Sequence, residues 1–182
     1  CPASGGDAMS LLTIAEGLAL NVSLVAPATV IGNTAREWAE ALQFANETGE
    51  ELARRVDWGL TKQVATLTGT GASVAHALPD DFSRLTQGVC VRFGITPVRQ
   101  LSRAEWNGLT AVAGTPRYFL LEGKTIRLWP HLQNGATVAV SYQSKNWTSA
   151  GGEAFAADSE TSLIDEALFL KGLIARWRRQ KG

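Results

Sequence analysis

Residues 118–142 read YFLLEGKTIRLWPHLQNGATVAVSY and carry the clearest β-strand signal in the chain. Runs rich in β-branched and aromatic residues alternate with two short polar segments, Glu122-Gly123-Lys124 and Asn134-Gly135. Glycine and asparagine readily adopt the positive φ angles that tight turns between antiparallel strands require. We therefore predict a three-stranded antiparallel meander with strands over residues 118–121, 125–129 and 137–143.

More β structure is predicted on the N-terminal side of this stretch. Alternation predicts strands around residues 64–67 and 89–93, and Leu78-Pro79-Asp80-Asp81-Phe82 should form an extended segment followed by a tight turn. Ser102 and Glu105 have the spacing of a capping box, which predicts a short helix lying across the sheet.

Two helices are predicted before the β region. Ser10 should cap a first short helix, whose apolar stripe consists of Leu11, Ile14, Ala15, Leu18 and Ala19. Thr34 and Glu37 suggest a capping box for a long helix over residues 34–56. Gly49 should weaken the middle of that helix.

A last helix is predicted to start after Asp158. Its apolar residues recur at heptad-like spacing: Leu163, Ala167, Leu170, Ile174 and Trp177. Such a stripe needs a partner, either the long helix through Trp38 and Leu42 or a neighbouring subunit.

Together these signals predict an α+β fold, with a helical bundle and a small antiparallel β meander module. The bundle would consist of the long central helix and the N- and C-terminal helices. We expect a single domain over residues 1–182, helical at about 9–56 and 158–182 and mainly β at about 60–147.

Composition excludes several classes of protein. Seventeen Lys and Arg balance seventeen Asp and Glu, so the chain as a whole has no electrostatic attraction to nucleic acid. Its apolar runs fall short of the roughly 18 residues that a membrane-spanning helix needs. Cys1 and Cys90 do not suggest a disulfide framework, and Met9 resembles a natural start that would make residues 1–8 an upstream extension.

A search for catalytic or metal-binding motifs predicts no enzyme and no cofactor. His76 and His131 lack the spacing of zinc ligands, and Asp80 and Asp81 read as turn residues. Gly69-Thr70-Gly71 lacks the third glycine and the following helix of a phosphate-binding loop, so it reads as a bend.

Two sets of residues are candidates for structural roles. The candidate contacts with a partner or a channel are the clustered cations Arg176, Arg178, Arg179 and Lys181, although cations at a helix C-terminus are also expected from the helix dipole. The candidate structural anchors are Trp38, Trp58, Phe82, Trp106 and Trp177.

The order and spacing of several segments resemble a family of head-to-tail adaptor proteins of tailed bacteriophages. These segments are residues 11–15, 45–58, 78–85 (LPDDFSRL), 101–106 (LSRAEW) and 155–166. The resemblance spans nearly the whole chain.

This resemblance implies a structural subunit of the virion neck, assembled in the cytoplasm of the bacterial host. Such adaptors form a ring, typically of twelve copies, below the portal protein, and give the tail or a stopper protein a platform. DNA would pass through the ring without specific binding, which a neutral chain allows because tight phosphate contacts would oppose its passage. No membrane would be involved.

Three other functions are alternatives to that of a neck adaptor. A tail-completion or tail-terminator protein of the same particle would bind the tail tube instead of the portal. A wall-degrading hydrolase would need a convergent catalytic set, for which His76, Asp80, Asp81 and Glu105 are the candidates. A surface lipoprotein would be processed at Cys1.

Overall fold

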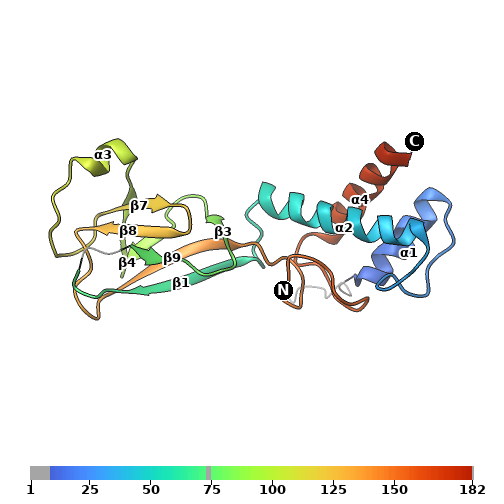
Figure 1. The fold of residues 1–182 in the computed structure, drawn as a ribbon, viewed down its shortest axis with the longest axis horizontal. Helices are drawn as coiled ribbons and strands as arrows, with labels where there is room; N and C mark the ends of the chain where they lie inside the picture. Colours follow the sequence, from blue (N-terminus) through green and yellow to red (C-terminus); the bar gives the residue numbers. More distant parts are fainter. Residues whose placement is uncertain (1–8, 73–74, 182) are drawn as a thin grey trace, which may run out of the picture. The chain divides into compact units, whose positions relative to one another are not determined.

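A computed structural model describes residues 9–72 and 75–181, so the upstream extension expected for residues 1–8 and the candidate lipid site at Cys1 lie outside the described residues. The chain divides into two compact units (Figure 1). The helical unit extends up to Thr61 and resumes at Lys145, and the β unit is Lys62–Ser144. That the two units act as the single domain expected from the sequence stays a prediction.

The first helix, α1 (Leu11–Val22), matches its predicted pattern. The Ser10 hydroxyl oxygen accepts a hydrogen bond from the Thr13 amide at 3.3 Å, which satisfies a free N–H of the first turn. All five residues of the predicted apolar stripe are buried. Ser23 ends the helix in the left-handed conformation, with φ of 57°.

The long helix, α2 (Arg36–Arg55), starts later than expected. The predicted capping box of Thr34 and Glu37 is wrong, because Ala35 occupies the N-cap position without a side-chain cap bond. The side chain of Asn33 accepts a hydrogen bond from the Ala35 amide at 2.9 Å instead. This bond holds the residues just before the helix in a turn, so the helical backbone begins at Arg36.

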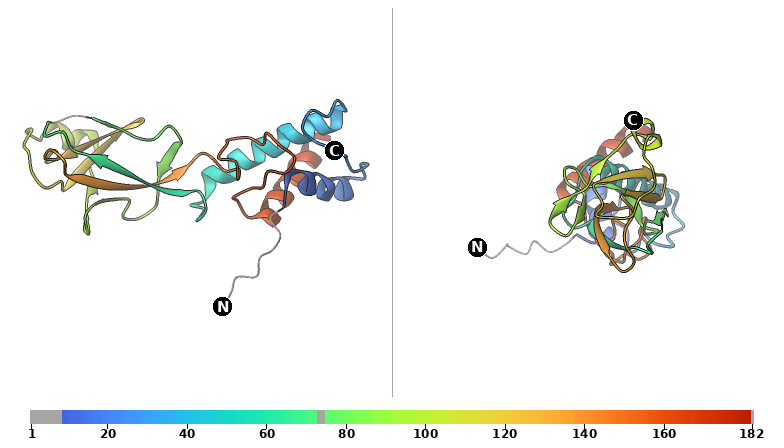
Figure 2. Two further views of the ribbon diagram at one scale, coloured as in Figure 1. Left: turned by 90° about the horizontal axis from the view of Figure 1, so that it is seen from below. Right: turned by 90° about the vertical axis from the view of Figure 1, so that its left-hand side faces the viewer.

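The last helix, α4 (Glu166–Lys181), also starts later than expected. Its first turn is capped by Asp165, whose carboxylate accepts a hydrogen bond from the Leu168 amide at 2.8 Å. Its buried residues are Phe169, Leu173 and Trp177, of which only Trp177 belonged to the predicted stripe. Helix α4 packs on α1 and on the predicted partner α2, as the views in Figure 2 show.

Asp158, the residue expected to begin the last helix, has a different role. Its carboxylate accepts hydrogen bonds from the Thr29 hydroxyl and from the amides of Val30 and Ile31, at 3.0 and 2.9 Å for the two amides. Burial raises the pKa of this carboxyl, but the three hydrogen bonds outweigh that effect and leave the pKa below its usual value. Asp158 thereby ties the loop before α4 to the loop between α1 and α2.

The core of the helical unit contains a close contact between Trp147 and Gly49. A Cβ atom at Gly49 would lie 2.4 Å from the Trp147 ring, well inside van der Waals contact. Trp147 is fully buried and also packs against Phe155 and Phe169, with ring centroids 4.9 and 5.7 Å away. Gly49 is therefore required for packing, although the sequence showed it only as a weak point in the helix.

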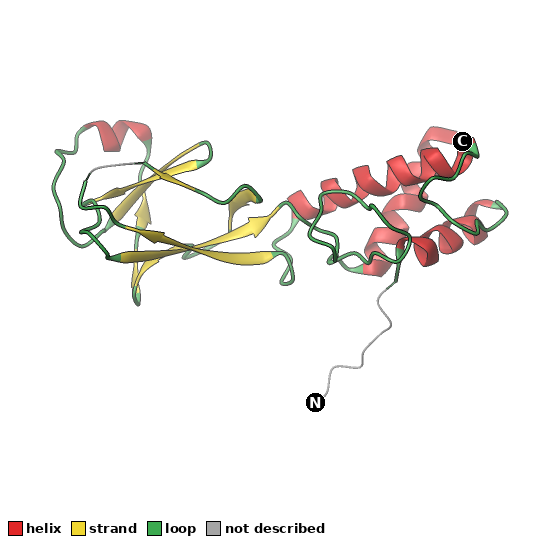
Figure 3. Ribbon diagram, turned by 60° about the horizontal axis from the view of Figure 1, so that its bottom comes forward, coloured by secondary structure: helices red, strands yellow, loops and turns green. Residues whose placement is uncertain are grey.

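The β unit consists of two sheets (yellow in Figure 3). The first sheet has the order β1-β9-β4-β5, formed by Lys62–Thr68, Thr137–Ser144, Val91–Phe93 and Thr96–Pro97, and β3 (Phe82–Leu85) also pairs with β9. The second sheet has the order β2-β8-β7-β6, formed by His76–Ala77, Thr125–Trp129, Tyr118–Glu122 and Arg99–Gln100. Side chains from both sheets, among them Phe119, Ile126 and Val140, form a second hydrophobic core.

The predicted meander is only half correct. Strands β7 and β8 pair as the expected hairpin, but β9 belongs to the other sheet. The place beside β8 is taken by β2, where His76 pairs with Ile126. Strand β9 instead pairs with β1 over seven residues, and its alternating Val138, Val140 and Tyr142 are buried.

The predicted fold class is wrong for the same reason. About 31% of the described residues are helical and 26% lie in strands of two sheets, so the protein is not a helical bundle with a small meander. The pairing of β6 with β7 is parallel, and the β unit has its own core. Several of its strands have only two residues, too few to leave a pattern in the sequence.

The short helix α3 (Arg103–Asn107) forms with both bonds of the predicted capping box between Ser102 and Glu105. It buries none of its own residues. The chain that follows it is tied to the second sheet, because the Trp129 indole N–H donates to the Thr110 carbonyl oxygen at 2.7 Å.

The contact between Trp147 and Gly49 predicts that Gly49→Ala destabilises the protein, whereas helix propensity alone predicts that it stabilises the protein. In an isolated helix, Gly49→Ala should stabilise by about 1 kcal/mol. Here the added methyl group overlaps the Trp147 ring, so we expect a loss of about 1–3 kcal/mol in the free energy of unfolding, measured by urea denaturation. Gly59→Ala is the matched control, because nothing lies within 4 Å of its added Cβ. A Gly49→Ala protein more stable than wild type would contradict the packing.

Candidate functional site

The four C-terminal cations differ in their surroundings. Arg176 donates to Glu47 and Glu51 of α2, each at 2.6 Å, and Lys181 forms an ion pair with Glu40 and lies 5.6 Å from the centre of the Trp177 ring. Glu47 and Glu51 are one turn apart on α2 and therefore face the same side of the helix. These two cations join α4 to α2 within the chain.

Arg178 and Arg179 remain on the surface. Arg178 donates to the Asn21 carbonyl oxygen at 3.2 Å, at the end of α1. Arg179 lines a small groove of about 170 Å³ between α2 and α4, together with Arg55, Arg176 and Glu51. Within the part of the chain that the structure describes, Arg179 forms no ion pair. Of the four candidate contacts, these two are thus the ones open to a partner.

Two large apolar side chains lie close in sequence to the residue that Arg178 contacts. Leu20 and Val25 are each 87% exposed, at the end of α1 and in the loop after it. Exposed apolar residues near arginine are typical of protein interfaces. We call Leu20, Asn21, Val25 and Arg178 the apical patch.

The sequence pattern did not predict this patch. The available signal was that Leu20 falls outside the buried stripe of α1, while Val25 follows the end of that helix. An apolar residue outside the stripe must be covered by some other element or remain on the surface. Only the folded unit shows that both side chains stay exposed.

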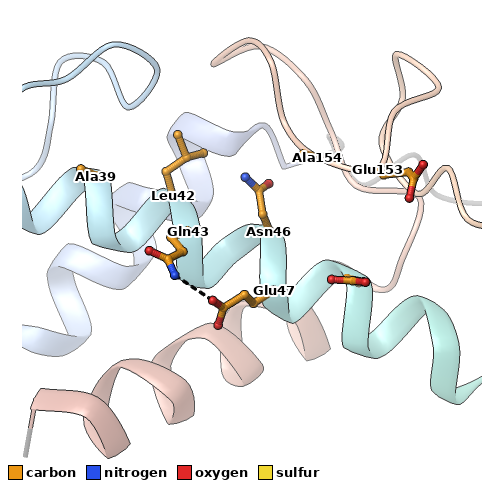
Figure 4. A pocket seen from close by; sticks show the side chains of 8 residues that line it. Ala39, Leu42, Gln43, Asn46, Glu47, Glu153 and Ala154 are labelled. Carbon is orange, nitrogen blue, oxygen red and sulfur yellow. Dashed lines mark hydrogen bonds between the residues drawn. The ribbon is translucent and has the colours of Figure 1, made fainter.

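A shallow groove of about 460 Å³ runs along α2 (Figure 4). It is lined by Ala39, Leu42, Gln43, Asn46, Glu47, Glu50, Glu153 and Ala154. Its three carboxylates already have cationic partners inside the protein: Glu47 with Arg176, Glu50 with Arg54 and Glu153 with Lys145. Its polar groups therefore stabilise the helical unit.

Three of the four catalytic candidates, Asp81, Glu105 and His76, have a local structural role. Asp81 accepts a hydrogen bond from the Tyr142 hydroxyl at 2.9 Å, and burial together with this carboxylate raises the pKa of Tyr142 to about 12. Glu105 caps α3, and the hydrogen bonds from Ser102 lower the pKa of its carboxyl. His76 lies in β2, where partial burial lowers the pKa of its imidazole.

Among the described residues, no group of three His, Cys, Asp or Glu side chains could hold a metal ion. No helix in the described ranges is both long and apolar enough to cross a bilayer.

The candidate anchors also differ in burial. Trp38, Phe82 and Trp177 are buried in the two cores. Trp58 is half-buried and donates its indole N–H to the Leu52 carbonyl oxygen at 2.8 Å, which closes the end of α2. Trp106 is half-buried on α3.

The charges are divided unevenly between the two units. The β unit, residues 62–144, contains eight Lys and Arg but four Asp and Glu. The described part of the helical unit has nine Lys and Arg against twelve Asp and Glu. A net charge of zero for the whole chain conceals a basic β unit and an acidic helical unit.

A comparison with protein families matches residues 18–179 to the SU10 adaptor protein family. The chain belongs to this family. The family is one of phage head-to-tail adaptors, so the resemblance drawn from the sequence is confirmed. None of the curated proteins matches this adaptor. The adaptor is thus a structural component of a phage particle.

The ion pairs of Arg176 give a prediction for the stability of this adaptor. Arg176→Ala removes both bonds to α2 from a partly buried side chain, so we expect a loss of about 1 kcal/mol in the free energy of unfolding. Arg179→Ala, one turn away on the same helix, should change it by less than about 0.5 kcal/mol. Both values come from urea denaturation, and equal losses would show that the ion pairs contribute nothing.

Proposed function

We propose that this adaptor is one copy in a ring, in the neck of a tailed phage, that sits below the portal protein and continues the DNA channel toward the tail. The match of residues 18–179 to a phage adaptor family carries the proposal. Twelve copies are expected from the resemblance, with assembly in the bacterial host. The ring performs no catalysis, and DNA passes through it without specific contacts.

The portal contact in this proposal is the apical patch together with Arg179. An apolar surface in a water-filled DNA channel would stay hydrated, whereas on another protein it is removed from water. Leu20 and Val25 therefore favour protein docking over lining of the channel. Arg178 and Arg179 would add charged contacts at the rim, while Arg176 and Lys181 hold the helices that present them.

The first experiment is electron microscopy of the purified adaptor with and without portal particles of the same phage, supported by light-scattering mass. We expect rings, or single copies that assemble into a ring on the portal. Single copies that ignore the portal but cap purified tail tubes would overturn the proposal in favour of a tail-completion protein. Indifference to both would also overturn it.

The apical patch can be tested by binding to immobilised portal particles. Leu20→Asp combined with Val25→Asp should weaken binding at least about tenfold, because the charges would have to be desolvated at the contact. The free energy of unfolding should change little, since both side chains are exposed. Ile95→Asp is the matched control, because Ile95 is 92% exposed but lies in the β unit. Equal weakening by both changes would place the contact elsewhere.

A further inference from the structure

Strand β1 (Lys62–Thr68) is the terminal strand of its sheet. It pairs on one side with β9 along its entire length, and among residues 9–72 and 75–181 no strand pairs with its other side. Its residues are mostly exposed, including Val64 at 60%. A seven-residue strand with one bare edge is a ready template for another strand.

The printed hydrogen bonds establish which backbone groups face outward. The Gly69 amide bonds to the Ala136 carbonyl oxygen at 2.8 Å, on the β9 side. Directions alternate along a strand, so Ala65 and Leu67 also point to β9. The Ser141 amide donates to the carbonyl oxygen of Cys90, next to β4, and therefore points away from β1. Because Ser141 lies directly opposite Val64, the N–H and C=O groups of Val64 point away from β9, which agrees with this alternation. The residues whose N–H and C=O groups point away from the sheet are Lys62, Val64, Thr66 and Thr68.

Beyond Lys62 at its first position, this edge lacks the charged residues and prolines that usually protect natural edge strands. Residues 63–68 (QVATLT) have no charge and no proline, and three of the six, Val64, Thr66 and Thr68, are β-branched and favour strands. The other edges of the β unit are blunted. Pro97 deprives β5 of an N–H group, β3 has an irregular register between Phe82 and Arg84, and β2 and β6 have two residues each.

We propose that the β1 edge binds an extended segment of another virion protein, which adds to the sheet as a further strand. The inference rests on the proposed ring. In a ring, each copy meets its neighbour through two different surfaces, and the blunted edges offer β1 no complementary strand. Pairing of β1 with β1 of a second copy would use one surface twice and close a dimer.

The geometry of the β1 edge determines the length and the residue types that the added segment needs. It needs about four to seven uncharged residues in extended conformation, to bond with the four outward residues. Alternate side chains would lie on the face that carries Ala65 and Leu67, beside the core, and should be apolar. The others would lie beside Val64 and Thr66, which face solvent.

Amide hydrogen exchange at residue resolution tests the inference on the wild-type protein. In the purified adaptor, the amides of Ala65 and Leu67 should be protected, while those of Val64 and Thr66 exchange fast. In assembled phage particles, the exchange of Val64 and Thr66 should slow by roughly tenfold or more. Fast exchange of both in particles would overturn the inference. Slow exchange in the purified protein that depends on its concentration would also overturn it, because the occupant would then be a second copy.

Variants of the outward residues supply a second readout, the yield of infectious particles. Thr66→Pro removes an outward N–H without touching the bonds to β9, and Val64→Lys keeps every backbone group but puts a charge at the edge. Both should lower the yield at least about tenfold, and the control Thr66→Val should not. Normal yields for both would contradict the inference. Ring formation on the portal by the wild type is scored separately, so the inference can fail while the proposed function stands.

Discussion

The indole ring of Trp147 lies against the backbone of α2 at Gly49, and the arrangement of the helical unit depends on this contact. Trp147 comes shortly after the chain has left β9, so it fixes where the returning chain meets the first two helices. Phe155 and Phe169 pack on the same ring, which places the following loop and the first turns of α4. Without a side chain at residue 49, the ring can be buried completely.

The packing of α4 determines which of its cations form ion pairs within the chain. Arg176 and Lys181 reach the acidic residues of α2, which removes them from the set of groups available to a partner. Arg178 instead contacts the end of α1, near the exposed Leu20, and Arg179 lines the groove beside Arg55 without forming an ion pair among the described residues. Packing therefore divides one basic cluster in the sequence into two structural and two exposed cations.

The β unit shows a comparable division among its edges. Proline, an irregular register and very short strands limit further pairing at β5, β3, β2 and β6. These features are common in proteins that must avoid uncontrolled association. Strand β1 carries none of them along its outward residues. A particle component that is exposed before assembly and covered afterward can tolerate such an edge, because its partner supplies the missing hydrogen bonds.

The amino-acid pattern was enough to predict α1 with its cap and buried stripe, the hairpin of β7 and β8, the capping box of α3 and the family. These features are local: each depends on residues a few positions apart, or on the order of segments along the chain. Three features became visible in the folded chain alone: β9 leaves the hairpin for β1, Gly49 receives Trp147, and Asp158 binds a distant loop instead of beginning a helix. Each of these contacts joins residues about 70 to 130 positions apart, and their energies depend on which surfaces meet, which residue spacing along the chain does not encode.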